Sequence, residues 1–95
     1  MTRPLHPWTD PKGGDVAVTA FGRRRTVRQI HMGSWGGQSF VSRVAYETEK
    51  GALRTCEGVT WATWCRRFAN RYERDGVDLL QQAAEAALAS GEDHL

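Results

Sequence analysis

The pattern of apolar and polar positions predicts strands in the first half of the chain. In "DVAVTAF", residues 15–21, alternate positions are apolar and place Val16, Val18 and Ala20 on one face, which is typical of a β-strand. The following "GRR" predicts a turn, and "RTVRQIH", residues 25–31, predicts the second strand of a hairpin. We therefore expect the fold to begin with an antiparallel pair.

A second hairpin shows the clearest alternation. The stretch "SFVSRVAYE" places Phe40, Val44 and Tyr46 on one side, "TEKG" predicts a turn, and "ALRTCEG", residues 52–58, predicts the partner strand. Between the two hairpins, "GSWGGQ", residues 33–38, has three glycines around one tryptophan. That composition predicts a mobile loop or a wide turn.

The stretch "TWATWCRRFANRYERDG", residues 60–76, predicts one long helix. Thr60 is a suitable N-cap, and Gly76 stands where a helix would stop. At 100° per residue the large apolar side chains share a sector about 100° wide, as expected for a helix packed on a sheet. These anchoring residues are Trp61, Trp64, Cys65, Phe68 and Tyr72.

An alanine-rich segment follows and predicts a second helix over residues 77–89. Its apolar stripe is thinner, which favours peripheral packing or a homodimer formed through this helix. The stripe consists of Val77, Leu80, Ala84 and Leu88.

Together these elements predict an α+β fold, with a small, curled antiparallel sheet of about four strands packed against one helix and a second short terminal helix. The order of elements resembles that of small SH3-like barrels. We expect a flexible Pro/Gly-rich arm over residues 1–14, a single domain over residues 15–90 and a frayed acidic tail over residues 91–95. Trp8 is expected to dock on the domain despite its place in the arm.

The chain has 95 residues and a net charge of +2, and its charge is unevenly distributed. Residues 1–71 carry twelve Lys/Arg against five Asp/Glu, a balance of +7, whereas residues 72–95 carry one Arg against six acids, a balance of −5. No apolar run has the length of a signal peptide core or a membrane span. We therefore expect a cytoplasmic protein of a prokaryote or of a virus that infects one, with no membrane partner.

Candidate catalytic and metal-binding residues are few. His31 with Cys56 or Cys65 could form a nucleophilic pair, but Cys65 falls on the apolar helix stripe, where burial makes a thiol unreactive. The two cysteines lack the close spacing of a zinc or redox motif, so we interpret them as buried thiols rather than as a disulfide. The sequence also lacks a phosphate-binding glycine motif. We expect no catalysis, no cofactor and no metal.

Arginines give the strongest functional indication. Four of them fall within six residues at the first hairpin, others follow along the chain, and Trp35 stands in the glycine-rich stretch. Such a surface could neutralise phosphates while Trp35 stacks on a base. The candidate binding residues are Arg23, Arg24, Arg25, Arg28, Trp35, Arg43, Arg54, Arg67 and Arg71.

Each of these features also has a structural explanation. The arginines could simply keep a strand face in water, and Trp35 could fold back as a lid over the sheet, which is slightly favoured for that residue.

We expect a non-enzymatic binding module that contacts nucleic acid or a nucleic-acid-binding complex through a basic hairpin face. The alternative is a protein-binding inhibitor or adaptor encoded by a phage or mobile element, in the manner of an anti-CRISPR protein, which uses the same face against an acidic protein surface. The acidic segment after Gly76 favours this alternative, because it would repel nucleic acid unless it points away.

Overall fold

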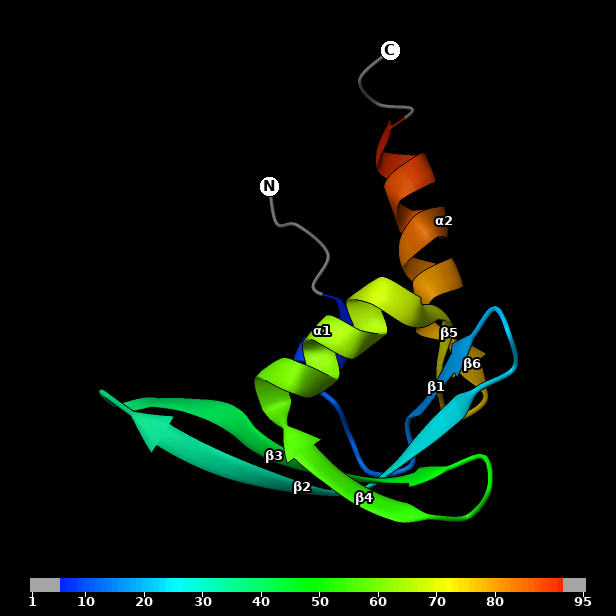
Figure 1. The fold of residues 1–95 in the computed structure, drawn as a ribbon. Coiled ribbons are helices and arrows are strands. Elements are labelled where there is room, and N and C mark those ends of the chain that lie inside the picture. Colours follow the sequence, from blue (N-terminus) through cyan, green and yellow to red (C-terminus); the bar gives the residue numbers. More distant parts are fainter. Residues whose placement is uncertain (1–5, 92–95) are drawn as a thin grey trace.

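The computed structural model describes residues 6–91 as an α+β domain with six strands and two helices (Figure 1). The predicted fold class and the antiparallel sheet are confirmed, but the sheet has six strands instead of about four. In chain order the elements are η1 (Pro7–Thr9, a 3₁₀ turn), β1 (Val16–Thr19), β2 (Arg24–Trp35), β3 (Gln38–Thr48), β4 (Leu53–Glu57), α1 (Gly58–Phe68), β5 (Ala69–Arg74), β6 (Val77–Asp78) and α2 (Leu79–Gly91).

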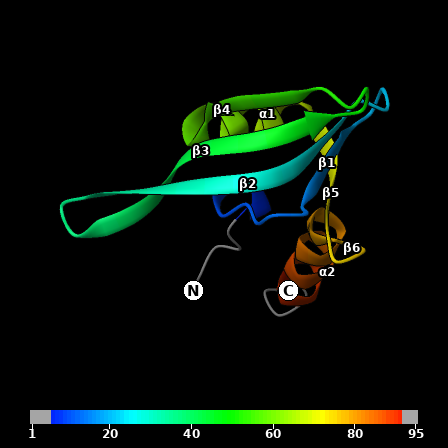
Figure 2. The ribbon, with the colours of Figure 1, turned by 90° about the horizontal axis from the view of Figure 1, so that it is seen from below.

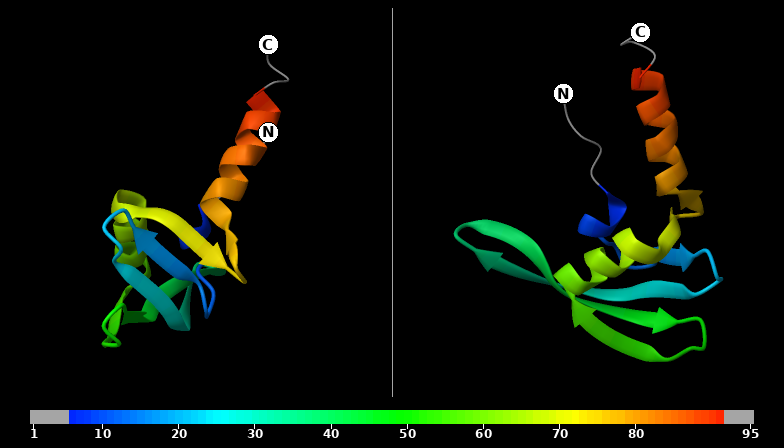
Figure 3. Two further views of the ribbon diagram at one scale, coloured as in Figure 1. Left: turned by 90° about the vertical axis from the view of Figure 1, so that its right-hand side faces the viewer. Right: turned by 45° about the horizontal axis from the view of Figure 1, so that its top comes forward.

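The strands lie in the order β4-β3-β2-β1-β5-β6, and every neighbouring pair is antiparallel. Since β4 is one edge of the sheet and β5 lies beyond β1, helix α1 has to cross one face of the sheet to connect them (Figure 3). The sheet is curled, and β4 and β6 are its two edges. The resemblance to an SH3-like barrel stays a prediction.

Side chains alternate between two faces of this sheet. Val27, Val44 and Tyr46 lie on the face that α1 covers and are buried, and we call this the helix-covered face. The other face carries the residues that alternate with these along each strand, and we call it the open face. Figure 2 views the sheet from below, with α1 behind the strands.

Two β-bulges explain why the apolar pattern departs from a strict period of two. Val27 pairs with Tyr46 and Gln29 pairs with Ala45, so Arg28 has no cross-strand partner. This extra residue returns Ile30 to the helix-covered face, where it packs against the core.

A second bulge corrects the predicted position of Phe40. His31 pairs with Arg43 and Met32 pairs with Val41, which leaves Ser42 as the extra residue in β3. Val41 therefore packs against the core, whereas Phe40 lies on the open face and is 47% exposed. Period-two alternation had placed Phe40 on the same side as Val44.

The predicted loop at residues 33–38 is instead the end of a long hairpin. Strands β2 and β3 continue to Trp35 and Gln38, and only Gly36 and Gly37 form the turn, with φ of 58° and 81°. Positive φ at both central residues is the geometry of the type I′ turn that suits a twisted hairpin. Trp35 is 83% exposed, so its predicted role as a lid over the sheet is wrong.

The predicted helix over residues 60–76 is too long. Helix α1 ends at Phe68, and the chain continues as strand β5, so Arg71 and Tyr72 belong to a strand. Tyr72 is nevertheless fully buried, because it pairs with Ala17 on the helix-covered face. Asp75 and Gly76 have φ of 54° and 80° and form the turn between β5 and β6, so Gly76 ends a hairpin strand and not a helix.

Helix α2 begins at Leu79, two residues later than predicted, and projects from the body (Figures 1 and 3). Asp78 Oδ1 accepts hydrogen bonds from the backbone N–H of Leu80 and of Tyr72, at 3.1 and 3.2 Å, and so caps the helix. Leu79 and Leu80 pack against the core, whereas Leu88 is 72% exposed. Packing of this helix is therefore confined to its first turns.

The core lies between α1, the sheet and the N-terminal turn. Trp8 is buried as predicted and meets Tyr72 edge-on, with ring centroids 6.4 Å apart. The core therefore includes a residue seven positions before Asp15, where the predicted domain begins. Its buried apolar members are Trp8, Ala17, Val27, Val44, Tyr46, Trp61, Cys65 and Tyr72.

A buried carboxylate connects β1, β5 and the N-terminal segment. Asp15 is fully buried, and its Oδ2 accepts hydrogen bonds from Tyr72 Oη at 2.8 Å and from the Lys12 N–H at 2.9 Å. Arg74 donates to both carboxylate oxygens, at 2.9 and 2.7 Å, and also to the Asp10 carbonyl. Asp15 raises the pKa of Arg74, and the pKa of Tyr72 is raised by burial and by this carboxylate. The network therefore keeps Arg74 charged and Tyr72 neutral.

Trp61 and Phe68 should differ strongly in their contributions to stability, although both belong to the predicted anchoring stripe. Trp61 is fully buried, so we expect Trp61→Ala to lower the free energy of unfolding by about 3–5 kcal/mol. Phe68 is 53% exposed, so Phe68→Ala should cost about 1 kcal/mol or less. Urea denaturation of both variants would measure the difference, and equal losses would contradict the described packing.

Two arginines of β5 provide a matched test of the buried network. Arg74→Ala should lower the free energy of unfolding by about 3–5 kcal/mol, because it leaves the Asp15 carboxylate buried without its cation. Arg71 pairs with Glu73 at the surface, so Arg71→Ala should cost less than about 1 kcal/mol. Thermal melting compares the two, and a smaller effect for Arg74→Ala would argue against the network as a major stabilising contact.

Candidate functional site

Four cations surround a groove on the helix-covered face, at the end of the sheet where the turns after β1 and β3 lie. The groove has a volume of about 290 Å³ and has Tyr46 and Trp64 among its walls. Trp64 is half-buried and lies on α1. We call this site the basic groove and define it by its cations Arg23, Arg25, Lys50 and Arg54.

Two hairpin turns of the same construction position Arg23 and Lys50. In each turn a threonine carbonyl accepts from a glycine N–H three residues on, at 3.1 Å for Thr19 and Gly22 and at 2.9 Å for Thr48 and Gly51. Each threonine hydroxyl also accepts from the N–H four residues on, at 3.1 and 3.2 Å. Both glycines have positive φ, 81° and 82°, as this kind of turn requires. The repeated pattern T-x-x-G therefore fixes both loops at the groove.

Arg25 is held by aromatic rings and not by a carboxylate. Its guanidinium carbon lies 3.9 Å from the centre of the Trp64 ring and 4.5 Å from that of Tyr46. Such cation–π contacts contribute about 0.5–2 kcal/mol each. Arg25 therefore joins helix α1 to the sheet and at the same time brings a positive charge into the groove.

The groove keeps an excess of positive charge. Within residues 6–91, none of its four cations forms an ion pair. Glu49 is the acidic residue in its lining, and hydrogen bonds from its own backbone N–H and from that of Arg24 lower its pKa, with smaller effects of Arg23 and Lys50. Glu49 is therefore ionised at neutral pH and offsets one of the four charges.

The structure divides the predicted arginines instead of bringing them onto one surface. Arg23, Arg25 and Arg54 meet at the basic groove, and Arg67 lies on α1 with its guanidinium 5.8 Å from the Phe68 ring. By strand alternation the other members lie on the open face, except that Arg28 occupies a bulge. These are Arg24, Arg28, Arg43 and Arg71.

The open face carries charges that are partly neutralised. Arg28 pairs with Glu47 at 3.1 Å, and Arg71 pairs with Glu73 at 2.8 Å. A shallow groove of about 690 Å³ beside β4 includes Arg28 and Arg54 in its lining, together with Leu53. The predicted surface of continuous positive charge is therefore replaced by the compact basic groove and a mixed open face.

Trp35 lies at the tip of the hairpin that β2 and β3 form, far along β2 from the groove (Figure 1). The sequence predicted this tryptophan as a candidate contact beside the arginines, but it did not show that strand β2 separates it from them. We define the β2–β3 arm as residues 31–43.

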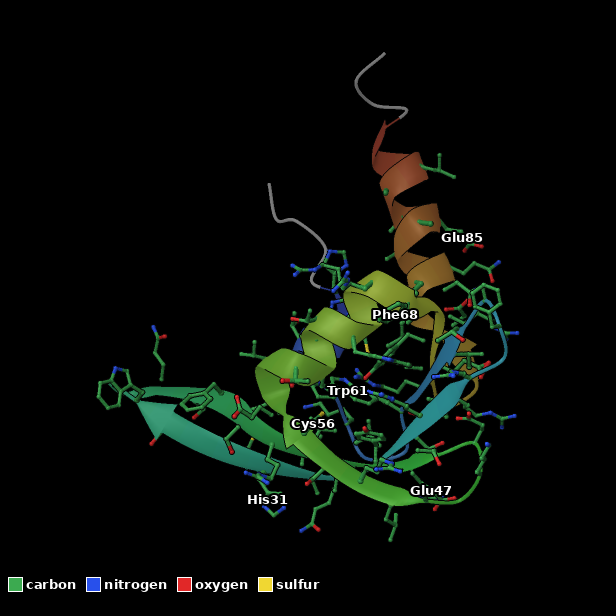
Figure 4. The ribbon with its side chains drawn as sticks, in the orientation of Figure 1. His31, Glu47, Cys56, Trp61, Phe68 and Glu85 are labelled. Atoms are coloured by element: carbon green, nitrogen blue, oxygen red, sulfur yellow. The ribbon has the colours of Figure 1, made fainter. Side chains whose placement is uncertain are left out.

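The candidate nucleophilic pair is not assembled. His31 points away from α1 on the open face (Figure 4), whereas Cys65 is a buried residue of α1 that packs in the core on the other face. Burial raises the pKa of Cys65 to about 12, and the pKa of Cys56 is also raised by burial. Both cysteines are free thiols. No cluster of three or more potential metal ligands occurs in the part of the chain that is described.

Sequence reasoning did not foresee Lys50, Tyr46 and Trp64 as parts of a site. The sequence pattern predicts Lys50 as a turn residue and Tyr46 and Trp64 as residues of apolar faces. Both aromatic residues do pack in or against the core. The signal that could have revealed Lys50 is the repeat of T-x-x-G in "TAFG" and "TEKG", because two equal turns at one end of a meander bring Arg23, which follows the first turn, and Lys50, inside the second, to the same groove.

Comparison with known proteins adds no family to this description. Neither the protein-family models, nor the curated proteins, nor the solved structures contain a match to this chain. Among the described helices, neither is long and apolar enough to cross a membrane.

The two thiols should react at different rates. We expect iodoacetamide at mildly alkaline pH to modify Cys56 before Cys65, because Cys65 is fully buried and its pKa is raised to about 12. The raised pKa favours the neutral thiol in the folded state, so its stabilising effect is present below the usual thiol pKa and is lost as the pH rises toward about 12. Mass spectrometry of labelled peptides would check the order, and faster labelling of Cys65 would contradict it.

Proposed function

We propose that this protein is a non-enzymatic module that binds nucleic acid through the basic groove. The supporting observation is the grouping of Arg23, Arg25, Lys50 and Arg54 around one groove without ion-pair partners in the described part of the chain. Maintaining like charges close together costs free energy unless an anion neutralises them. A polyanion with regularly spaced charges is a suitable ligand for such a group.

The shape of the groove favours a phosphate backbone over an isolated anion. Its cations come from two hairpin loops and from β2 and β4, so a ligand with several phosphates can contact cations of more than one element. Arginine forks bind phosphate oxygens in pairs, and Lys50 adds a flexible point charge at the loop. Contacts of this kind are independent of base sequence.

The proposal predicts a strong dependence of binding on salt. We expect the log affinity for a single-stranded oligonucleotide to fall with log salt, and Arg23→Ala combined with Arg54→Ala should flatten the slope by about 1.4, since each phosphate contact contributes about 0.7. Fluorescence anisotropy at several salt concentrations measures both slopes.

A second double variant serves as the control. Arg28→Ala combined with Arg71→Ala removes the same formal charge, but both arginines already pair with carboxylates on the other side of the sheet. This control should change the slope much less than the groove variant. Equal flattening by both variants, or no binding by the unmodified protein even at low salt, would reject the groove as a nucleic-acid site.

The second candidate is the protein-binding inhibitor or adaptor, and the exposed edge of the sheet favours it. Strand β4 has a partner on one side only, and its first residue, Leu53, lines the shallow groove and is 72% exposed. A partner protein could add an extended segment to this edge. Recovery of one stoichiometric protein after nuclease treatment, and its loss on Leu53→Glu, would support this candidate.

A further inference from the structure

The β2–β3 arm differs from the rest of the surface in its charge. Residues 31–43 contain no acidic side chain, and Arg43 is their one residue with a fixed positive charge. The arm extends beyond the end of α1 and away from the body (Figures 1 and 2). An anionic ligand could therefore follow it without meeting a carboxylate between His31 and Arg43.

Several contacts make the base of the arm rigid. Gly58, the first residue of α1, lies so close to β3 that an added Cβ would stand 2.1 Å from the Val41 carbonyl oxygen. The Ser42 hydroxyl donates to the His31 carbonyl at 3.0 Å and bridges the bulge. Nearer the tip, the Phe40 ring covers Gly33, since a Cβ on Gly33 would lie 2.8 Å from Phe40 Cζ. The arm is thus packed against the start of α1 at its base and joined across its two strands nearer the tip.

Trp35 is presented at the free end of this support. It is 83% exposed and directly precedes the Gly36–Gly37 turn. By alternation it shares the open face with Phe40 and with Arg43, and Arg43 lies nearer the body along β3. An exposed indole on a well-packed hairpin has little conformational freedom left to lose on binding. Its flat face is available to a planar ligand.

We propose that Trp35 stacks on an unpaired base of a single-stranded nucleic acid while the body holds the phosphates, an inference that rests on the proposed function. Aromatic stacking accepts every base, which suits a site without a set of base-edge hydrogen-bond donors. An unpaired base fits better than a duplex step, because it reaches Trp35 without unstacking its neighbours. Lack of acidic residues along the arm permits the adjoining phosphates to approach.

The basic groove and Trp35 lie on opposite faces of the sheet, so a strand that reaches both has to follow β2 and pass around the free tip of the arm. The length of β2 therefore sets the least size of that ligand. Trp35 lies ten positions after Arg25 of the groove, which corresponds to about 33 Å of extended strand. A stacked single strand with about 3.4 Å per nucleotide needs about ten nucleotides to cover that distance. Oligonucleotides used in the test should therefore be longer than this.

An abasic oligonucleotide separates stacking from charge, because it keeps every phosphate and lacks the bases. We expect the unmodified protein to bind a mixed-sequence single strand about 5- to 100-fold more tightly than an abasic strand of equal length. Trp35→Ala should remove this preference and leave the salt slope unchanged. Trp35→Phe should retain most of the preference, whereas Trp35→Leu, which keeps apolar bulk without a flat ring, should lose it.

A control variant tests whether any exposed apolar side chain has the same effect. Leu88 on α2 is 72% exposed, and Leu88→Ala should leave the base preference intact. Melting temperatures of all variants should match that of the parent, since neither side chain contacts the core.

The possible outcomes distinguish the two proposals. Equal affinity of the unmodified protein for normal and abasic strands, with a salt slope that still depends on Arg54, would overturn the stacking role of Trp35 and retain the groove. A Trp35-dependent preference for duplex over single strand would also overturn it in favour of insertion between base pairs. Failure to bind either strand at low salt would reject the proposed function itself and the stacking with it.

Discussion

The buried carboxylate of Asp15 determines how strands β1 and β5 meet. Burying the charge of Asp15 is costly unless it is fully compensated, and the compensation comes from Arg74, Tyr72 and the backbone of Lys12. These partners belong to β5 and to the segment that carries Trp8. The same contact therefore holds β5 against β1 after the chain has crossed the sheet as α1, and it fixes the N-terminal turn over the core. The Arg74 guanidinium is consequently engaged by the Asp15 carboxylate and is not available to bind a ligand.

Sequence patterns located the β1–β2 and β3–β4 hairpins, but they missed the β2–β3 hairpin and the end of the long helix. Alternation identified the strands around Val44 and Tyr46, because one side of those strands is buried. Tyr72 misled the helix prediction, since a residue four positions after Phe68 continues a helical stripe and can equally face the core from a strand. The Asp75–Gly76 pair was the contrary signal, because Asp-Gly favours a type I′ hairpin turn over a helix stop.

The distribution of arginines between the two faces could be predicted only in part. Adjacent residues of a strand point to opposite faces, so Arg24 and Arg25 could not contribute to one surface of β2. The bulges at Arg28 and Ser42 then shift the phase by one residue, and neither bulge leaves a mark in the local composition. The groove itself arises from long-range pairing, which places the loop after β1 beside the loop after β3. That proximity is a property of the register and not of either loop alone.

The division of the sequence into a basic body and an acidic tail has a different meaning in the folded protein. Glu73 pairs with Arg71, and Asp78 accepts two backbone hydrogen bonds at the start of α2, so these acids are used where they stand. Within the described residues of α2, Glu85 is the one ionisable side chain. Part of the acidic segment is therefore used inside the fold, through the ion pair of Glu73 and the helix cap of Asp78. What decides the field at the basic groove is local pairing: among the described residues, carboxylates pair with Arg28, Arg71 and Arg74, whereas Glu49 is the one acidic side chain in the groove lining.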